Sequence, residues 1–128
     1  MLTGLAIIAD NNKILIGRLK KEKLEKYGGI QYVFPSAQTE RPEDIQNKVI
    51  REVKTQANLD IIATNKIGER IHPITQNLTY YYLCNVKESR ISVSPKADIE
   101  EFMWVTKKEI SEYMPFLFEK IKEYLQIT

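Results

Sequence analysis

The stretch from Pro42 to Asn58 constrains the fold of this chain more than any other. Its aliphatic residues recur at every fourth position: Ile45, Val49, Val53 and Ala57. This period predicts an amphipathic helix with one buried stripe. Pro42 suits the first helical turn, where no amide N–H is needed, and Asn58 suits a left-handed C-cap. We therefore expect one helix over residues 44–57.

The side of this helix opposite the apolar stripe is polar. Lys48, Glu52 and Gln56 are spaced by four residues, so their side chains form one column along the helix. The loop before the helix, residues 35–43, is expected to fold over the space that this column faces. The column is therefore the first candidate for a functional site.

Composition limits the class of protein. The chain has 128 residues, 43% of them hydrophobic, and a formal net charge of +2. The length fits a single domain over residues 1–128 with a sizeable core, and the charge is too small to predict a nucleic-acid binder from its field. Cys84 is the one cysteine, which excludes an internal disulfide and favours a reducing, cytoplasmic location. No segment reaches the roughly 18 apolar residues of a membrane helix.

Strand-like segments lie on both sides of the helix. They are rich in aliphatic, β-branched and aromatic residues and cover residues 2–9, 13–19, 30–34, 60–72, 78–86, 91–93 and 101–106. The first two are expected to form a hairpin around Asp10, Asn11 and Asn12, which are typical turn residues. This order of strands and helices indicates an α/β (α+β) fold with a mixed sheet, not a doubly wound parallel sheet.

Two further helices are expected at the C-terminal end. The first covers residues 107–113 with Thr106 as its N-cap, and the second starts at Pro115. The aromatic and aliphatic residues of the second helix are predicted to form a core face: Phe116, Phe118, Ile121, Tyr124 and Leu125.

Residues 18–29 carry most of their charge on lysines, interspersed with two glutamates. One interpretation is a solvated loop or a short helical turn. The other is a basic flap near an anionic ligand, with Arg18 as a substrate-binding residue.

The segment from Phe34 to Leu59 resembles the Nudix box. Laid on that family's pattern without a gap, the chain keeps Glu43 and the Arg51-Glu52-Val53 triplet. It departs from the pattern at both glycines and at both members of the glutamate pair, where it has Ala37, Asn58, Thr55 and Gln56. The resemblance therefore implies a degenerate Nudix box, and with it the Nudix α/β/α sandwich, a mixed β-sheet between helices.

Nudix enzymes cleave a pyrophosphate bond with the help of Mg²⁺ or Mn²⁺, so the resemblance implies such a cofactor. Hard cations prefer carboxylate oxygens. Of the family's three metal-binding helix positions only Glu52 is still a carboxylate, which predicts low metal affinity. Lys48 lies one turn before it and would repel a metal or pair with a phosphate. Glu52, Gln56, Glu40 and Glu101, or Glu100 in its place, are expected to form a reduced metal site.

The resemblance also assigns roles to single residues. Glu52, Arg51 and Glu43 are the expected catalytic residues, with Arg51 bracing the box loop through Glu43. Lys48, Arg18 and Tyr80 are the expected substrate-binding residues, with Tyr80 stacking on a nucleobase.

Two functions follow from the resemblance. The first is a Nudix-type hydrolase of a nucleoside diphosphate linked to another group, with an atypical metal site. The second is a catalytically inactive Nudix domain that binds a nucleotide or a protein partner. An unrelated small α+β binding domain is the alternative outside the family. The expected partner is a nucleotide-like small molecule, not a membrane or a sequence-specific nucleic acid, and a homodimer is an open alternative because Nudix proteins are often dimers.

Overall fold

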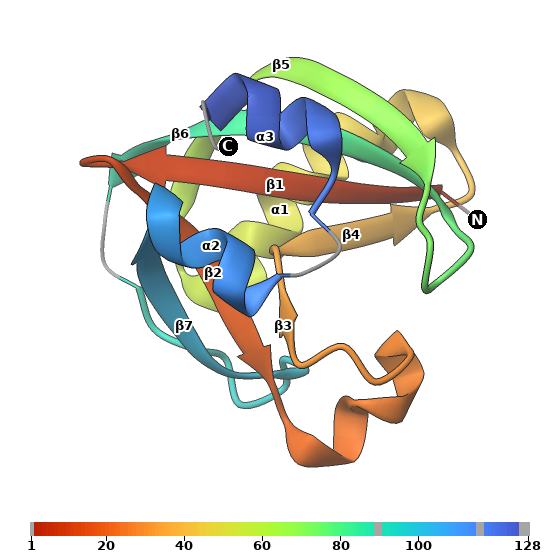
Figure 1. Ribbon diagram of the computed structural model, residues 1–128, viewed down its shortest axis with the longest axis vertical. Coiled ribbons are helices and arrows are strands. Elements are labelled where there is room, and N and C mark those ends of the chain that lie inside the picture. Colours follow the sequence, from red (N-terminus) through yellow and green to blue (C-terminus); the bar gives the residue numbers. More distant parts are fainter. Residues whose placement is uncertain (1, 89–90, 115–116, 126–128) are drawn as a thin grey trace.

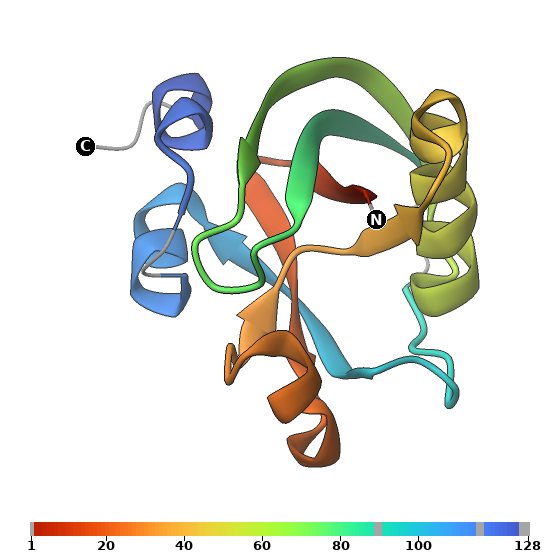
Figure 2. The same cartoon turned by 90° about the vertical axis from the view of Figure 1, so that its right-hand side faces the viewer.

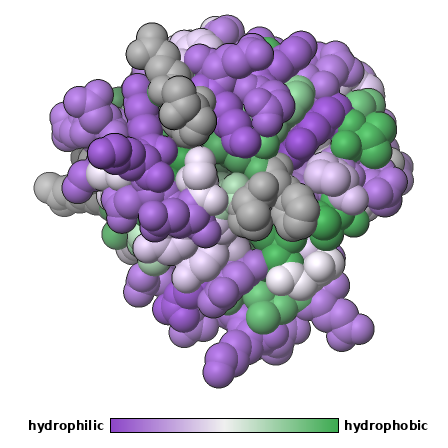
Figure 3. Space-filling view, viewed as in Figure 1, coloured by the Kyte–Doolittle hydropathy of each residue, from purple (hydrophilic) through white to green (hydrophobic). Residues whose placement is uncertain are grey.

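The computed structural model describes residues 2–88, 91–114 and 117–125. In this part of the chain one mixed sheet lies between helices (Figure 1). Figure 2 shows helix α1 on one side of the sheet and helices α2 and α3 on the other. The face that carries α2 and α3 is mostly hydrophilic, with apolar residues exposed in smaller areas near its centre and toward the right-hand edge of the view (Figure 3). The predicted α/β/α sandwich is confirmed.

The sheet contains all the strands of the described residues: β1 Leu2–Asp10, β2 Lys13–Leu19, β3 Tyr32–Val33, β4 Ser36–Thr39, β5 Asp60–Ile71, β6 Leu78–Glu88 and β7 Ile99–Thr106. Their order is β3-β2-β1-β6-β5, with β4 paired to β1 and β7 paired to β2. The pair of β1 and β6 is parallel and the other pairs are antiparallel. β1 is therefore the central strand, and it lies directly beneath the helix of the predicted site.

The helical segments are short except for α1. They are the 3₁₀ turns η1 Lys21–Lys23, η2 Glu25–Tyr27 and η3 Pro42–Asp44, and the α-helices α1 Ile45–Ala57, α2 Lys107–Tyr113 and α3 Glu119–Leu125. Asn58 ends α1 in the left-handed conformation, as predicted. Thr106 caps α2, and its side chain forms a reciprocal capping box with Glu109. The predicted helix start at Pro115 lies outside the described residues.

Helix α1 is fixed by its apolar stripe. Ile45, Val49, Val53 and Ala57 are at most 1% exposed, and they pack on the sheet in one core cluster. Gly4 of β1 lets the helix approach closely, because a Cβ there would lie 2.6 Å from Cγ2 of Val49. A second core on the other face of the sheet holds α2 and α3 through Ile110, Ile121 and Leu125. The polar column of α1 lies beside this stripe, and its last member, Gln56, reaches the backbone of Ser36 in β4.

Three expectations about local structure were wrong. The box loop contains strand β4, which pairs with β1. Residues 91–93 form no strand; instead the backbone amides of Ser92 and Ser94 donate to the carbonyls of Ala57 and Gln56 at the end of α1, which would otherwise lack partners. Tyr124 is 48% exposed and does not belong to the core.

None of the described helices is long and apolar enough to span a membrane.

Candidate functional site

A cleft of about 780 Å³ runs along the polar side of α1; we call it the α1 cleft. One wall is the column Lys48, Glu52 and Gln56, which the sequence predicted as a unit. The floor is the segment from Phe34 to Gln38, which leads into and forms β4. The helical period thus places the three side chains, and the antiparallel pair of β4 with β1 places the backbone opposite them.

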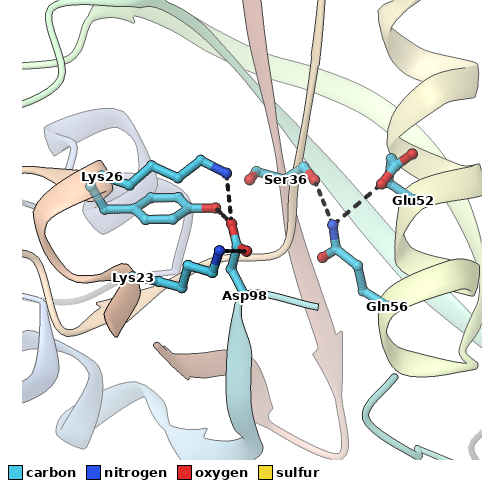
Figure 4. Close-up of polar contacts among 7 residues, drawn as sticks. Lys23, Lys26, Ser36, Glu52, Gln56 and Asp98 are labelled. Atoms are coloured by element: carbon cyan, nitrogen blue, oxygen red, sulfur yellow. Dashed lines mark hydrogen bonds and ion pairs between the residues drawn. The ribbon is translucent and has the colours of Figure 1, made fainter. Parts of the chain in front are cut away.

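Gln56 bridges two oxygen atoms in this cleft. Its Nε2 donates to the carbonyl oxygen of Ser36 at 3.5 Å and to Oε2 of Glu52 at 3.4 Å. Both partners are acceptors only, so the amide nitrogen must face them. Both hydrogen bonds are long and therefore weak. Figure 4 shows the Gln56 amide lying between the two oxygens.

The opposite wall comes from two segments that are far apart in sequence. Residues 20–29, called the flap below, contribute Lys26, Tyr27 and Gly28, and residues 94–99 contribute Lys96 and Asp98. The two segments are joined by backbone and side-chain hydrogen bonds from Lys20. Its N donates to the carbonyl of Asp98 and its Nζ to the carbonyl of Pro95, both at 2.9 Å.

Asp98 is the centre of this wall. Its Oδ2 accepts from Nζ of Lys26 at 2.9 Å and from the hydroxyl of Tyr27 at 2.8 Å, and its Oδ1 lies 3.8 Å from Nζ of Lys23. Partial burial acts to raise the pKa of Asp98, but the hydrogen bonds from Lys26 and Tyr27 and the nearby lysine charges outweigh it and hold this pKa below its usual value. Burial, followed by the contact with Asp98, raises the pKa of Tyr27. Asp98 is therefore a fixed anion and Tyr27 a fixed donor.

The charged side chains that line the cleft are three lysines and two carboxylates, which leaves a net charge of +1. Lys26, Lys48 and Lys96 face it together with Glu52 and Asp98. Asp98 is already paired with the flap lysines. No ion pair within the described residues involves Lys48 or Lys96. The cleft thus presents two ammonium groups without a carboxylate partner, which favours an anionic ligand.

A second cavity of about 420 Å³ shares a wall with the α1 cleft; we call it the tyrosine pocket. Its lining is largely aromatic and aliphatic: Tyr27, Tyr32, Phe34, Ile74, Tyr81, Tyr113, Met114, Leu117 and Phe118. Tyr32 and Tyr113 pack edge to face with ring centroids 4.8 Å apart. Tyr27, Phe34 and Ile74 line both cavities. The two cavities therefore adjoin each other at these three residues.

His72 lies at the rim of the tyrosine pocket, in the turn between β5 and β6. Its Nδ1 accepts from the backbone amides of Ile74 at 3.1 Å and Thr75 at 3.3 Å. A nitrogen that accepts two hydrogen bonds carries no proton. Burial, and then the charge of Arg70, lower the pKa of His72. These bonds give His72 a structural role in the turn.

The other predicted substrate and metal residues are not brought together. Arg18 and Glu101 lie opposite each other on β2 and β7 and form an ion pair at 3.8 Å. Neither they nor Glu40 and Glu100 belong to the described lining of the α1 cleft. Residue 101 of β7 is held in register with β2, and this pairing directs it to Arg18 rather than toward α1.

The predicted brace between Arg51 and Glu43 is absent from the described ion pairs. Glu43 instead pairs with Arg41 at 3.0 Å, and Arg51 is exposed. Arg41 is two residues from Glu43, whereas eight residues of helix span about 12 Å. Glu43 therefore forms its ion pair with Arg41, the arginine nearer to it along the chain.

Tyr80, the predicted stacking residue, lies on the face of β6 opposite the tyrosine pocket. Neighbouring residues of a strand point to opposite faces. Tyr81 lines the tyrosine pocket, while Tyr80 packs against the core under α1 with Nζ of Lys66 3.6 Å from its ring centroid. The tyrosine that faces a cavity is therefore Tyr81.

Nudix hydrolases generally use divalent metals, and the donor set of this cleft does not fit one. No group of three His, Cys, Asp or Glu side chains in the described part of the chain could hold a metal ion. Glu52 receives an N–H from Gln56, and Asp98 is paired with two lysines. A divalent centre wants several carboxylate or carbonyl oxygens, whereas here an amide N–H is directed at the two oxygens that α1 and β4 bring together.

Sequence reasoning included Lys26 only as part of the basic flap, and it missed Lys96 and Asp98. From the segment before β7 it is Asp98 that brings a carboxylate to the cleft, although Glu100 or Glu101 was expected to supply it. A signal existed in the lysine-rich flap, which the basic-flap interpretation used. No pattern pointed to Asp98, because its partners are 71 and 72 residues away.

Comparison with known proteins finds solved structures with a similar fold but no match to a family model or a curated protein sequence. No protein-family model matches the chain, and no curated protein matches it. The MutT protein from Methanosarcina mazei Go1 is 15% identical at a TM-score of 0.70, over 98% of this chain and 90% of that one. A Nudix hydrolase from Nitrosomonas europaea is 14% identical at a TM-score of 0.72, over 98% and 69%. An Ap4A hydrolase from C. elegans is 13% identical at a TM-score of 0.70, over 97% and 92%.

These identities are too low to transfer an activity, but the TM-scores and the near-complete coverage of this chain define the architecture. Together with the helix that follows β4 and the mixed sheet, they establish that the chain has the MutT-like Nudix fold.

Proposed function

We propose that the protein binds a nucleotide-like ligand, with the phosphate groups in the α1 cleft and the aromatic base in the tyrosine pocket. Binding, rather than metal-assisted hydrolysis, is the function that the geometry supports best. The name of the C. elegans neighbour refers to a nucleotide with linked phosphates, which agrees with this class of ligand.

The observation that carries the proposal is the charge of the cleft. Lys48 and Lys96 line it without an ion-pair partner among the described residues. In a metal-dependent site the divalent cation would neutralise the phosphates, and here lysine ammonium groups take that part. The adjoining tyrosine pocket then supplies apolar and aromatic contacts, which favour a flat base.

A second candidate is slow hydrolysis of a pyrophosphate bond, as the resemblance to Nudix enzymes implies. One observation favours it: the carboxylates of Glu52 and Asp98 line the same cleft. Both are engaged by donors, so neither is poised as a base in this arrangement.

Calorimetric titration with inorganic pyrophosphate and with ADP, in EDTA and again in Mg²⁺, tests the proposal. We expect ADP to bind more tightly than pyrophosphate, with an affinity that EDTA does not abolish. Lys48→Gln removes one phosphate contact and should weaken binding about five- to tenfold, since a charge-assisted hydrogen bond at a partly exposed site contributes roughly 1–1.5 kcal/mol. Lys54→Gln is the matched control, because Lys54 is on the same helix but pairs with Asp60 outside the cleft.

Equal losses in Lys48→Gln and Lys54→Gln would mean that only net charge matters and would contradict the proposed site. Binding that requires Mg²⁺, together with phosphate release from ADP, would favour the hydrolase instead. Absence of binding to both probes would refute the proposal.

A further inference from the structure

The flap carries an unusual concentration of donors around one carboxylate. Lys23, Lys26 and Tyr27 all converge on Asp98, which is 20% exposed. Figure 4 shows Lys23 and Lys26 extended toward Asp98 from the flap. Two ammonium charges face one carboxylate charge here, so the cluster keeps a net positive charge after the pair has formed. A phosphate group, with a charge of about −1.5 to −2 and three acceptor oxygens, would match these donors better than a carboxylate does.

We infer that Lys23, Lys26 and Tyr27 form a phosphate subsite of the α1 cleft, and that Asp98 fills this subsite as an internal anion with which a ligand phosphate must compete. The inference rests on the proposed function, because it places a second phosphate of the same ligand opposite Lys48. Lys26, Tyr27 and Asp98 all line the cleft, so the exchange needs no opening of the core.

The flap is built to survive such an exchange. Its apolar side chains Leu24 and Tyr27 pack on the small core of Leu19, Ala97 and Ile99. Lys20 fixes the base of the flap to the backbone of residues 95 and 98. The flap therefore keeps its position when Asp98 releases the lysines, and only side chains need to rotate. The lysine side chains have that freedom, since Lys26 is 63% and Lys23 42% exposed.

The alternative is that Asp98 merely holds the flap in place. The two interpretations predict opposite signs. If Asp98 competes with the ligand, removing its charge tightens phosphate binding. If Asp98 only supports the flap, removing its charge leaves binding unchanged or weakens it.

The decisive variant is Asp98→Asn, titrated with inorganic pyrophosphate beside the wild-type protein. We expect about tenfold tighter binding, because charge-assisted contacts no longer have to be exchanged. Asp60→Asn is the matched control: it removes the same charge from an exposed pair with Lys54 outside the cleft. A tightening that Asp60→Asn reproduces would be a net-charge effect and would overturn the inference.

A second pair of variants does not touch Asp98 and serves if Asp98→Asn fails to fold. Lys26→Gln removes a donor of the subsite and should weaken pyrophosphate binding several-fold, whereas Lys21→Gln, an exposed flap lysine, should not. Pyrophosphate binding by wild type that neither Asp98→Asn tightens nor Lys26→Gln weakens would overturn the subsite and leave the proposed function intact. Absence of binding to both pyrophosphate and ADP in every variant would remove the proposed function and the subsite together, whereas ADP binding without any pyrophosphate binding would overturn the subsite alone.

Discussion

Replacing Gln56 by Glu should remove its hydrogen bond to Glu52 and make the stability of the protein depend on a divalent cation. In the protein the Gln56 amide donates to the carbonyl of Ser36 and to the carboxylate of Glu52. A glutamate of the same length offers only acceptors at that position. Three oxygen ligands would then face one another with no donor between them, which is the arrangement that a hard divalent cation stabilises.

The magnitude follows from the distance. Two unit charges at the 3.4 Å that now separates Nε2 of Gln56 from Oε2 of Glu52 repel by about 5 kcal/mol at an effective dielectric constant of 20 and by about 1 kcal/mol in water. The cleft is open and the side chains can rotate apart, so we expect a loss of about 1–2 kcal/mol in the free energy of unfolding. For a chain of this length that corresponds to a fall in Tm of roughly 3–8 °C.

Thermal unfolding in EDTA and in Mg²⁺ measures the effect without any assay of activity. Gln56→Glu should have a lower Tm than the wild type in EDTA and should regain most of it in Mg²⁺, and adding Thr55→Glu should enlarge the response. The wild-type Tm should not depend on Mg²⁺. Gln46→Glu is the matched control, because Gln46 is an exposed residue of the same helix whose amide reaches the carbonyl of Ala63 instead.

Two results would refute this reasoning. A Gln56→Glu protein that is as stable as the wild type in EDTA would mean that the amide does not separate the two oxygens. A wild-type Tm that rises strongly with Mg²⁺ would mean that the present donor set holds a divalent cation after all.

Two further predictions concern residues that line the tyrosine pocket, one in the turn between β5 and β6 and one in the flap. Burial lowers the pKa of His72 in the folded protein. The stability that neutral His72 contributes is therefore present above its ordinary pKa of about 6.5 and is lost as the pH falls through the lower, folded-state pKa. The Tm measured from pH 7.5 to 5 should fall for the wild type and fall less for His72→Gln. Gly28→Ala should lower the free energy of unfolding in chemical denaturation by about 2–4 kcal/mol, because φ is 70° and a Cβ would lie 2.5 Å from Cγ2 of Ile74. Gly29→Ala, with φ of 85° and no atom within 4 Å of a Cβ, should lower it only by the backbone strain of roughly 1–2 kcal/mol. Equal costs for the two glycines, or a slope with pH that His72→Gln leaves unchanged, would contradict these accounts.

The sequence predicted helix α1 well because every signal in that segment is local. The four-residue period set the buried stripe, and Asn58 set the end. The column of Lys48, Glu52 and Gln56 followed from the same period, and all three residues line the cleft. The spacing of residues along a helix fixes which side chains share a face, so the sequence alone predicted the α1 wall of the cleft.

The sequence did not predict the opposite wall of the cleft, because the position of that wall depends on pairing between segments that are far apart in the chain. Whether a residue of β7 faces the cleft is decided by its register with β2, and this register joins Glu101 to Arg18. Tyr80 and Tyr81 illustrate the same limit, since a strand of three tyrosines does not say which face meets the pocket. Alternation predicts that neighbours differ, but only the packed sheet decides which of them is inside.

The departures of this chain from the Nudix pattern change the charge of the cleft in one direction. Thr55 and Gln56 replace two carboxylates of the pattern, and Lys48 places an ammonium group in the same column of α1. Lys96, which lies outside the pattern, lines the same cleft, and neither lysine has an ion-pair partner among the described residues. Loss of activity alone requires only the first kind of change. The second kind supplies the positive charge that bound metal ions would otherwise bring to a phosphate. A cleft with fewer carboxylates and with two lysines that lack ion-pair partners among the described residues suits the phosphates of a nucleotide, and this is why we place phosphate binding, and not metal-assisted hydrolysis, at the centre of the proposed function.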